Sequence, residues 1–248
     1  MVASLCACGQ KDTGSDLQTV TKGKLIMSTN AEFAPYEYVA DDGKGFQGTG
    51  YEGIDIEIAY ALAQKLGLEL VVDNMDFDAA LSAVQTGKSD MVAAGVTVTP
   101  DRLNAMSFTD SYANGVQVVI VKEGSDIKSI DDLQGKKIGT QRGTTGFLYC
   151  SDDFGDDNVI GFDDGATAVQ NLKAGKIDCV VIDNVPAQEY VKANPGLTIL
   201  DTEYANEDYA IGIAKDNTAL QEALNKALAE LKADGTIQSI IDKYIPAK

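Results

Sequence analysis

The stretch VQTGKSDMVAAGVT, residues 84–97, contains the end of a helix, a Gly-Lys turn, an aspartate and an apolar strand. The stretch LKAGKIDCVVIDNV, residues 172–185, has the same features in the same order. Residues 23–33 and 135–145 form a second matching pair, in which a strand runs into a polar loop. Two matching pairs in the same order predict two lobes of similar build.

The first half of the chain alternates between apolar strands and amphipathic helices. Residues 24–29, 68–72 and 90–96 are apolar enough for buried strands. Residues 53–67 predict a helix, because isoleucine or leucine recurs at every fourth position, and residues 78–86 predict another. This alternation predicts an α/β fold with a largely parallel sheet, which binds ligands at the carboxyl ends of its strands.

Two further apolar strands, residues 116–121 and 209–214, flank the second α/β unit. Because they stand at its two ends, we expect them to be the hinge strands at which the chain crosses between lobes. The prediction is that residues 24–115 and 210–248 form lobe 1, and that residues 116–209 form lobe 2.

The composition excludes several classes of function. The chain has 248 residues, of which 44% are hydrophobic, so it can bury a substantial core. Its formal net charge of −18 makes nucleic acid an unsuitable partner, because phosphates bind to basic surfaces. Histidine is absent, which excludes Ser-His-Asp and Cys-His catalysis and most catalytic zinc sites. We therefore expect no catalytic residue, no metal site and no cofactor.

The amino-terminal segment, residues 1–23, differs from the rest of the chain. Leu5-Cys6-Ala7-Cys8-Gly9 resembles the end of a bacterial lipoprotein signal, and a polar tether follows it. The resemblance implies a truncated signal, a lipid on Cys8, and a protein exported to the cell membrane or periplasm. Cys6 is unusual inside such a motif, and an unstructured start with two incidental cysteines is the alternative. No apolar run reaches the roughly 18 residues of a membrane span, so the lipid is the expected membrane contact.

Two cysteines lie outside this segment, Cys150 and Cys179. In an oxidising compartment they can form a disulfide, and in a reducing one they would be buried thiols. The sequence leaves both interpretations open, because it does not place the two residues within bonding distance.

Arg102 is unusual because the chain has only two arginines, Arg102 and Arg142, against eighteen lysines. Thr99 and Pro100 predict the start of a helix, which places Arg102 in the first turn, next to the end of a strand. A guanidinium group beside free backbone N–H groups forms a site for a planar carboxylate, with a geometry that lysine lacks. A surface ion pair with a nearby aspartate is the alternative.

The second half of the chain supplies complementary groups. The glycine-rich stretch 139–146 follows a strand and opens a helix, so Thr144 and Thr145 can offer backbone N–H groups to the same anion. It lacks the Lys-Ser/Thr ending of a nucleotide-binding P-loop. Asp183 ends a buried strand, where a carboxylate is costly without a cation. A free α-amino acid, which carries a carboxylate and an ammonium group, would satisfy both Arg102 and Asp183.

These motifs together resemble the polar amino-acid family of extracellular solute-binding proteins that serve ABC importers. The resemblance covers nearly all of residues 24–244 and rests on GIDIEIAYALAQKLG (53–67), FDAALSAVQTGKSDM (77–91), AGVTVTPDR (94–102), MSFTDSY (106–112) and VVIDN (180–184). It implies a two-lobed periplasmic-binding-protein ("Venus flytrap") fold, with two similar α/β lobes that close at a hinge.

The resemblance also implies the roles of individual site residues. The ligand α-carboxylate is expected at Arg102, Thr97 and Thr145, and the α-ammonium group at Asp183 and the Gly95 carbonyl. The ligand side chain is expected between Phe33 and Phe77, in a pocket that Asn30, Gln141 and Thr144 also line. Core packing is the alternative for the two phenylalanines.

One departure from the family pattern concerns the ligand side chain. Relatives that take cationic amino acids have an aspartate at the position of Asn30 and another acid at the position of Gly50. Both losses favour a neutral polar ligand such as glutamine, since a buried guanidinium group requires a counter-charge. Glu32 and Asp76 are close enough in sequence to supply one, so cationic amino acids remain the alternative.

The primary hypothesis is a monomeric binding protein that captures a free amino acid and delivers it to an ABC permease. A second hypothesis is an enzyme that resembles the cyclohexadienyl dehydratases of the same fold, with Glu32 as general acid. A third is a receptor module for sensing, which the lack of a transmembrane stretch or signalling domain disfavours.

Overall fold

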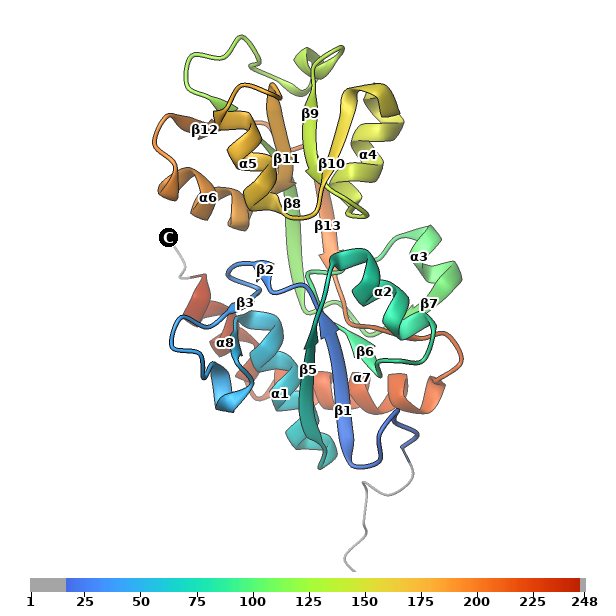
Figure 1. Cartoon of the computed structure of the whole chain (residues 1–248). Coiled ribbons are helices and arrows are strands. Elements are labelled where there is room, and N and C mark those ends of the chain that lie inside the picture. The colour runs from blue at the N-terminus through green and yellow to red at the C-terminus, as the bar shows by residue number, and fades with distance from the viewer. Residues whose placement is uncertain (1–16, 246–248) are drawn as a thin grey trace, which may run out of the picture.

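The computed structural model describes residues 17–245, and each of its two lobes is built around its own sheet (Figure 1). The two-lobed α/β fold that the sequence predicts is therefore confirmed. The proposed lipidation site, Cys8, lies outside the described residues. Within the described part of the chain, no helix combines the length and the apolar character that a membrane span requires.

The sheet of the first lobe has a parallel part and an antiparallel part. Its strands, in spatial order, are β5 (Glu69–Asn74), β1 (Lys24–Thr29), β6 (Met91–Val92), β14 (Gly212–Ala214) and β7 (Met106–Phe108). β5, β1 and β6 are parallel, whereas β14 is antiparallel to both β6 and β7. The helices of this lobe are α1 (Ile54–Leu66), α2 (Phe77–Gln85), α3 (Pro100–Ala105), α7 (Thr218–Ala233) and α8 (Thr236–Tyr244).

The predicted helix at residues 53–67 is confirmed as α1, which ends at Gly67 in the left-handed conformation (φ 69°). Its isoleucines pack against β1 and α7 in the largest apolar core of the molecule. A small antiparallel sheet of β2 (Glu32–Phe33), β3 (Glu37–Val39) and β4 (Tyr51–Glu52) precedes α1, with a short 3₁₀ helix at 46–48 between β3 and β4.

The sheet of the second lobe repeats this plan. Its strands, in spatial order, are β10 (Val159–Phe162), β9 (Ile138–Gln141), β11 (Cys179–Asp183), β8 (Ala113–Lys122) and β12 (Leu197–Ile199), and β13 (Ala205–Tyr209) also pairs with β8. β10, β9 and β11 are parallel, and β8 is antiparallel to its partners. The helices are α4 (Thr145–Phe154), α5 (Gly165–Lys173) and α6 (Asn184–Ala193), with 3₁₀ turns at 130–133 and 156–158.

β8 and β13 connect the two lobes (Figure 1). They pair antiparallel, with Ala113 opposite Tyr209 and Gln117 opposite Ala205. The stretch 209–214, which we expected as the second crossing strand, is divided. Tyr209 ends β13, whereas Gly212–Ala214 forms β14 in the sheet of the first lobe. The residue boundaries of the lobes stay a proposal.

β6 is shorter than the strand predicted at residues 90–96, because only Met91–Val92 form ladder pairs. Gly95 has φ 53°, which turns the chain, and its N–H donates to Asp55 Oδ2 at 2.8 Å instead of to a strand. The turn brings Gly95 and Thr97 to the edge of the lobe that faces the second lobe.

The two cysteines outside the amino-terminal segment are free thiols in the structure. Cys150 on α4 and Cys179 on β11 are fully buried in one apolar cluster of the second lobe. Burial raises the pKa of Cys150 to about 12 and that of Cys179 further, so neither thiol ionises at neutral pH.

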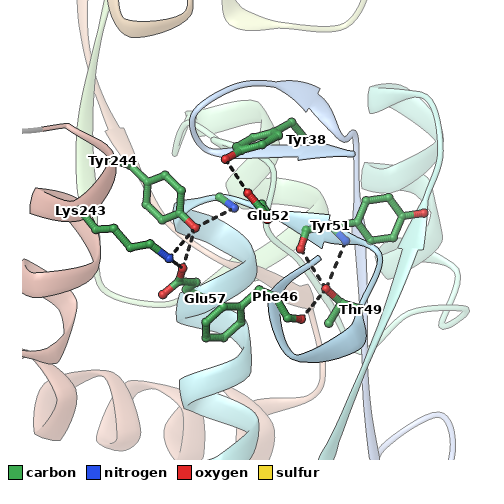
Figure 2. A network of polar contacts seen from close by, with 9 residues as sticks. Tyr38, Phe46, Thr49, Tyr51, Glu52, Glu57, Lys243 and Tyr244 are labelled. Atoms are coloured by element: carbon green, nitrogen blue, oxygen red, sulfur yellow. Dashed lines mark hydrogen bonds and ion pairs between the residues drawn. The ribbon is translucent and has the colours of Figure 1, made fainter. Parts of the chain in front are cut away.

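Helix α8 is fastened to the first turn of α1 by a polar network (Figure 2). The Tyr244 hydroxyl donates to Glu57 Oε1 at 2.6 Å and accepts from the Gly53 N–H at 3.3 Å. Lys243 forms an ion pair with the same Glu57 carboxylate and lies 5.6 Å from the centre of the Phe46 ring. The network holds the carboxyl-terminal helix, α1 and the β3–β4 connection together.

Candidate ligand-binding site

A cavity lies between the two lobes, lined by residues of both. All ten residues that the sequence analysis assigned to the site line this cavity: Asn30, Phe33, Phe77, Gly95, Thr97, Arg102, Gln141, Thr144, Thr145 and Asp183. The first six come from the first lobe and the last four from the second. The structure therefore brings the predicted residues together, and their role in ligand binding stays a prediction.

Arg102 lies at the start of α3, as the sequence indicates. Thr99 caps this helix by accepting the Arg102 N–H at 3.2 Å, and Pro100 follows it. Arg102 Nη1 donates to the Thr97 carbonyl at 2.9 Å, and Nη2 donates to the Gly143 carbonyl of the second lobe at 3.2 Å. A guanidinium group has five N–H donors, so further donors remain for a ligand.

The surroundings of Arg102 are those of a buried cation. Its side chain is 8% exposed and takes part in none of the ion pairs of residues 17–245, so the alternative of a surface ion pair does not hold. Burial lowers the pKa of Arg102, and the nearby carboxylate of Glu207 acts against that shift. The guanidinium carbon lies 5.4 Å from the centre of the Phe77 ring, which is a cation–π contact.

The amino end of α4 faces the same cavity from the second lobe. Thr144 caps the helix by accepting the Phe147 N–H at 3.3 Å, while its hydroxyl donates to the Gln141 carbonyl at 2.8 Å. The Thr145 and Thr97 hydroxyls lie 3.5 Å apart across the two lobes. Free N–H groups at a helix start favour anions, so this end of the cavity suits a carboxylate.

Asp183, at the end of β11, provides a negative charge in the second lobe. Its carboxylate accepts from the Tyr209 hydroxyl at 2.6 Å, the Val116 N–H at 3.0 Å and the Val185 N–H at 3.1 Å. The residue is 1% exposed, and burial raises its pKa to about 6. Gly115 makes room for it, because a Cβ there would lie 2.4 Å from Asp183 Oδ2. A buried, oriented carboxylate without a cation is suited to a ligand ammonium group.

Amide and aromatic groups form the remaining wall. Asn30 Oδ1 accepts from Gln141 Nε2 at 2.8 Å, which joins the two lobes, and Asn30 Nδ2 donates to the Met75 carbonyl at 3.0 Å. Phe33 and Phe77 both line the cavity while packing against apolar clusters behind it. Each of these two side chains therefore both packs in the core and lines the cavity.

Four further polar residues, which the sequence did not point to, also line the cavity: Glu37, Gln117, Glu207 and Tyr209. Gln117 on β8 donates to Glu207 on β13 at 2.9 Å, so the pair joins the two crossing strands next to Arg102. Only the pairing of these distant strands brings the two together. A signal exists for Gln117, which is an isolated polar residue among the apolar residues of β8, whereas Glu207 stands between two other polar residues.

Acidic side chains of both lobes lie near Glu32. Glu32 is exposed and does not line the cavity. Partial burial and the charges of Asp164, Asp76 and Asp163 raise its pKa, so acids from both lobes approach one another there. Arg142 offsets part of this charge through an exposed ion pair with Asp163 at 2.6 Å.

Comparison with known proteins agrees with this geometry. Residues 25–247 match the model of the bacterial extracellular solute-binding proteins, family 3. The chain belongs to this family. Family 3 relatives include the arginine-binding extracellular protein ArtP of Bacillus subtilis (strain 168), which is 33% identical over 97% of this chain and 92% of that protein.

Two solved structures resemble the chain more closely in sequence. An ancestral arginine-binding protein bound to glutamine is 40% identical, with a TM-score of 0.84 over 92% of this chain and 100% of that one. An ancestral arginine-binding protein bound to arginine is 41% identical, with a TM-score of 0.82 over 90% of this chain and 98% of that one.

Proposed function

We propose that the protein binds a free L-amino acid between its lobes outside the cytoplasm and delivers it to the permease of an ABC importer. One observation carries the proposal: Arg102 of the first lobe and Asp183 of the second line the same cavity, both are buried, and neither belongs to an ion pair among residues 17–245. An α-amino acid neutralises both, with its carboxylate at Arg102 and its ammonium group at Asp183 and the Gly95 carbonyl.

For the ligand side chain, we favour a neutral polar group, with glutamine first. The wall carries the amide groups of Asn30 and Gln141, which can exchange hydrogen bonds with a side-chain carboxamide. The rings of Phe33 and Phe77 offer flat apolar faces to its methylene groups. The ancestral protein with glutamine bound supports this choice.

A cationic side chain is the second candidate, and the acids around Glu32 favour it. A longer side chain that passes between Phe33 and Phe77 would approach Glu32 and Asp76, whose mutual repulsion a positive charge would relieve. The arginine-binding relative and the arginine-bound ancestral protein support this candidate.

The remaining parts of the proposal concern the state of the protein in the cell. We propose a monomer that a lipid on Cys8 anchors to the membrane, on the strength of the Leu5–Gly9 motif. We also propose that it is not an enzyme, because Glu32, the acid that the dehydratase alternative requires, is exposed and outside the cavity lining.

Calorimetric titration with each of the twenty L-amino acids at pH 7, with D-glutamine and D-arginine as controls, tests this function. We expect strong binding of L-glutamine, and weak binding of both D-isomers, because inversion at Cα misaligns the two charged groups. Failure of all twenty amino acids to bind would refute the proposal. If arginine displaced glutamine in competition, the second candidate would replace the first.

A further inference from the structure

Two carboxyl groups are buried next to the cavity, and the proposed ligand contacts do not involve them. Glu37 on β3 lines the cavity, and Asp55 lies in the first turn of α1. Each residue is 1% exposed. The ion pairs found among residues 17–245 include neither carboxyl group. Two adjacent carboxyl groups without a cation do not both ionise, because the charges would repel each other in a dry environment.

The two groups lie beside the Tyr112 hydroxyl. In the described part of the chain, both Glu37 oxygens, Asp55 Oδ1 and the Tyr112 hydroxyl are buried without a hydrogen-bond partner. Tyr36 is a further titratable group beside them. Burial raises the pKa of Asp55 to about 6 and that of Glu37 well above its ordinary value. A shared proton satisfies buried oxygens that otherwise have no partner.

The geometry indicates which group carries the proton. Asp55 Oδ2 accepts the Gly95 N–H at 2.8 Å, and Asp55 lies at the amino end of a helix of thirteen residues, where a negative charge is favoured. Glu37 has neither advantage. These contacts favour the negative charge on Asp55 and the proton on Glu37.

The Glu37–Asp55 pair acts on the predicted ligand site through Gly95. This residue has φ 53°, and a Cβ on it would lie 2.8 Å from Phe33 Cε1. The Phe33 ring packs against one side of the Gly95 turn, and Asp55 accepts the Gly95 N–H on another side. The direction of the Gly95 carbonyl, which we expect to accept the ligand ammonium group, follows from these two constraints.

We propose that Glu37 and Asp55 share one proton and act as a positioning pair, which holds the Gly95 turn in the orientation that the ligand ammonium group requires. The role in binding rests on the proposed function, whereas the shared proton is a property of the ligand-free protein. The two can therefore be tested separately.

The shared proton is tested by urea unfolding of the ligand-free protein between pH 5 and pH 8. The raised pKa of Glu37 means that the folded state holds a proton that the unfolded chain releases, so the free energy of unfolding falls as the pH rises. Glu37→Gln keeps a donor for Asp55 without a titrating proton. We expect the pH dependence of the free energy of unfolding to be smaller in this variant, by close to one proton. At pH 8 the variant should be more stable than the unmodified protein.

Glu69→Gln is the matched control, because Glu69 is an exposed glutamate on β5, and it should keep the full pH dependence. An unchanged pH dependence in Glu37→Gln would overturn the shared proton. If that variant does not fold, the Glu37 carboxyl ¹³C resonance of the unmodified protein decides. We expect the shift of a protonated acid at pH 7, and the shift of a carboxylate would overturn the proposal.

The positioning role is tested with Asp55→Asn, titrated with L-glutamine and L-arginine. We expect affinity for the preferred amino acid to fall about tenfold, because a neutral amide holds the Gly95 N–H less firmly, while the exposed control Glu69→Gln stays within about threefold. The Gly95 amide proton should shift upfield only in Asp55→Asn. Unchanged affinity in that variant would overturn the role.

Two further outcomes complete this test. If Asp55→Asn does not fold, the Gly95 amide proton of the unmodified protein should still show the downfield shift of a bond to a carboxylate, and its absence would refute the role. If the unmodified protein binds no amino acid, the proposed function fails, and with it the positioning role. The urea experiment then still decides whether the proton is shared.

Discussion

At the scale of the residue, contacts on its own side of the cavity hold each of Arg102 and Asp183. Arg102 donates to the Thr97 carbonyl, and Asp183 accepts two backbone amides and the Tyr209 hydroxyl. Because these bonds already fix the side chains, little side-chain entropy is lost when a ligand binds. Substitutions at the two positions should therefore change affinity through geometry as well as charge.

Arg102→Lys should weaken amino-acid binding and leave the fold intact. An ammonium group cannot donate to two carbonyls and also offer a two-pronged contact to a carboxylate. We expect a loss of about 2–5 kcal/mol in binding free energy by calorimetry. Arg142→Lys is the matched control, because the other arginine is exposed and pairs only with Asp163. Equal affinity of Arg102→Lys and the unmodified protein would contradict the assignment.

Affinity should depend on pH through Asp183. Burial raises the pKa of Asp183 to about 6, so the ligand-free protein takes up a proton there as the pH falls below 6. A ligand ammonium group requires the ionised form, and binding should weaken by up to about tenfold per pH unit below that point. The stability of the ligand-free protein depends on pH with the opposite sign. Because the pKa of Asp183 is raised in the folded state, the free energy of unfolding falls as the pH rises through 4 to 6.

Calorimetry from pH 5 to pH 8 measures the effect on binding, with Asp183→Asn for comparison. This variant should bind more weakly at pH 8 and show less dependence on pH. Tight binding by Asp183→Asn at pH 8 would place the ammonium group elsewhere.

At the scale of the element, α8 depends on its contacts with α1. The Tyr244 hydroxyl lies between the Glu57 carboxylate and the Gly53 N–H (Figure 2). Tyr244→Phe removes these two bonds and a third from Lys243 Nζ while it keeps the ring, so we expect a loss of about 1–2 kcal/mol in the free energy of unfolding. Ligand affinity should not change, because the network is outside the cavity lining. Urea unfolding measures the loss, and a stability equal to that of the unmodified protein would show that water replaces these contacts.

The elements differ in how far the sequence could predict them. α1 and β1 were predictable because their periodic apolar residues all face one core. β6 was predicted too long, since apolar residues 93–96 suggested a strand while Asp55, on a helix far away in sequence, captures the Gly95 N–H. A local sequence pattern cannot reveal a contact between residues so far apart in the chain.

The same distinction applies to the site. Arg102, Thr144 and Asp183 stand at strand ends and helix starts, positions that the sequence marks with capping residues and glycine. Glu37 follows the polar loop at 30–35 and has the pattern of an exposed strand residue, although it is fully buried. Glu207 reaches the cavity only because β13 pairs with β8.

At the scale of the whole molecule, contacts between the lobes suggest that the structure is closed. Asn30 bonds to Gln141, and Arg102 bonds to Gly143, each pair joining the first lobe to the second. A ligand that touches both lobes favours the state in which they meet. Small-angle scattering should therefore give a smaller radius of gyration with saturating amino acid than without it. Identical curves would exclude ligand-driven closure under those conditions.

Gly143→Ala should hinder this closure. A Cβ at Gly143 would lie 1.6 Å from Asp78 Oδ1 of the first lobe, and the residue has φ 75°, which alanine adopts only with strain. We expect weaker binding and a smaller contraction on ligand addition in scattering. Asp78→Ala in the same chain removes the collision but not the strain, and it should recover part of the affinity. No recovery would mean that backbone strain alone accounts for the loss.

The position of β14 also determines the order in which the chain can be completed. β14, formed by Gly212–Ala214, occupies the place between β6 and β7, whereas all strands of the second sheet end by residue 209. A chain that emerges from its amino end therefore completes the second sheet while the first still has a gap. Until β14 arrives, β6 and β7 present unpaired edges, which can recruit strands from other chains. A strand late in the chain, β14, thus closes the sheet that β1 begins.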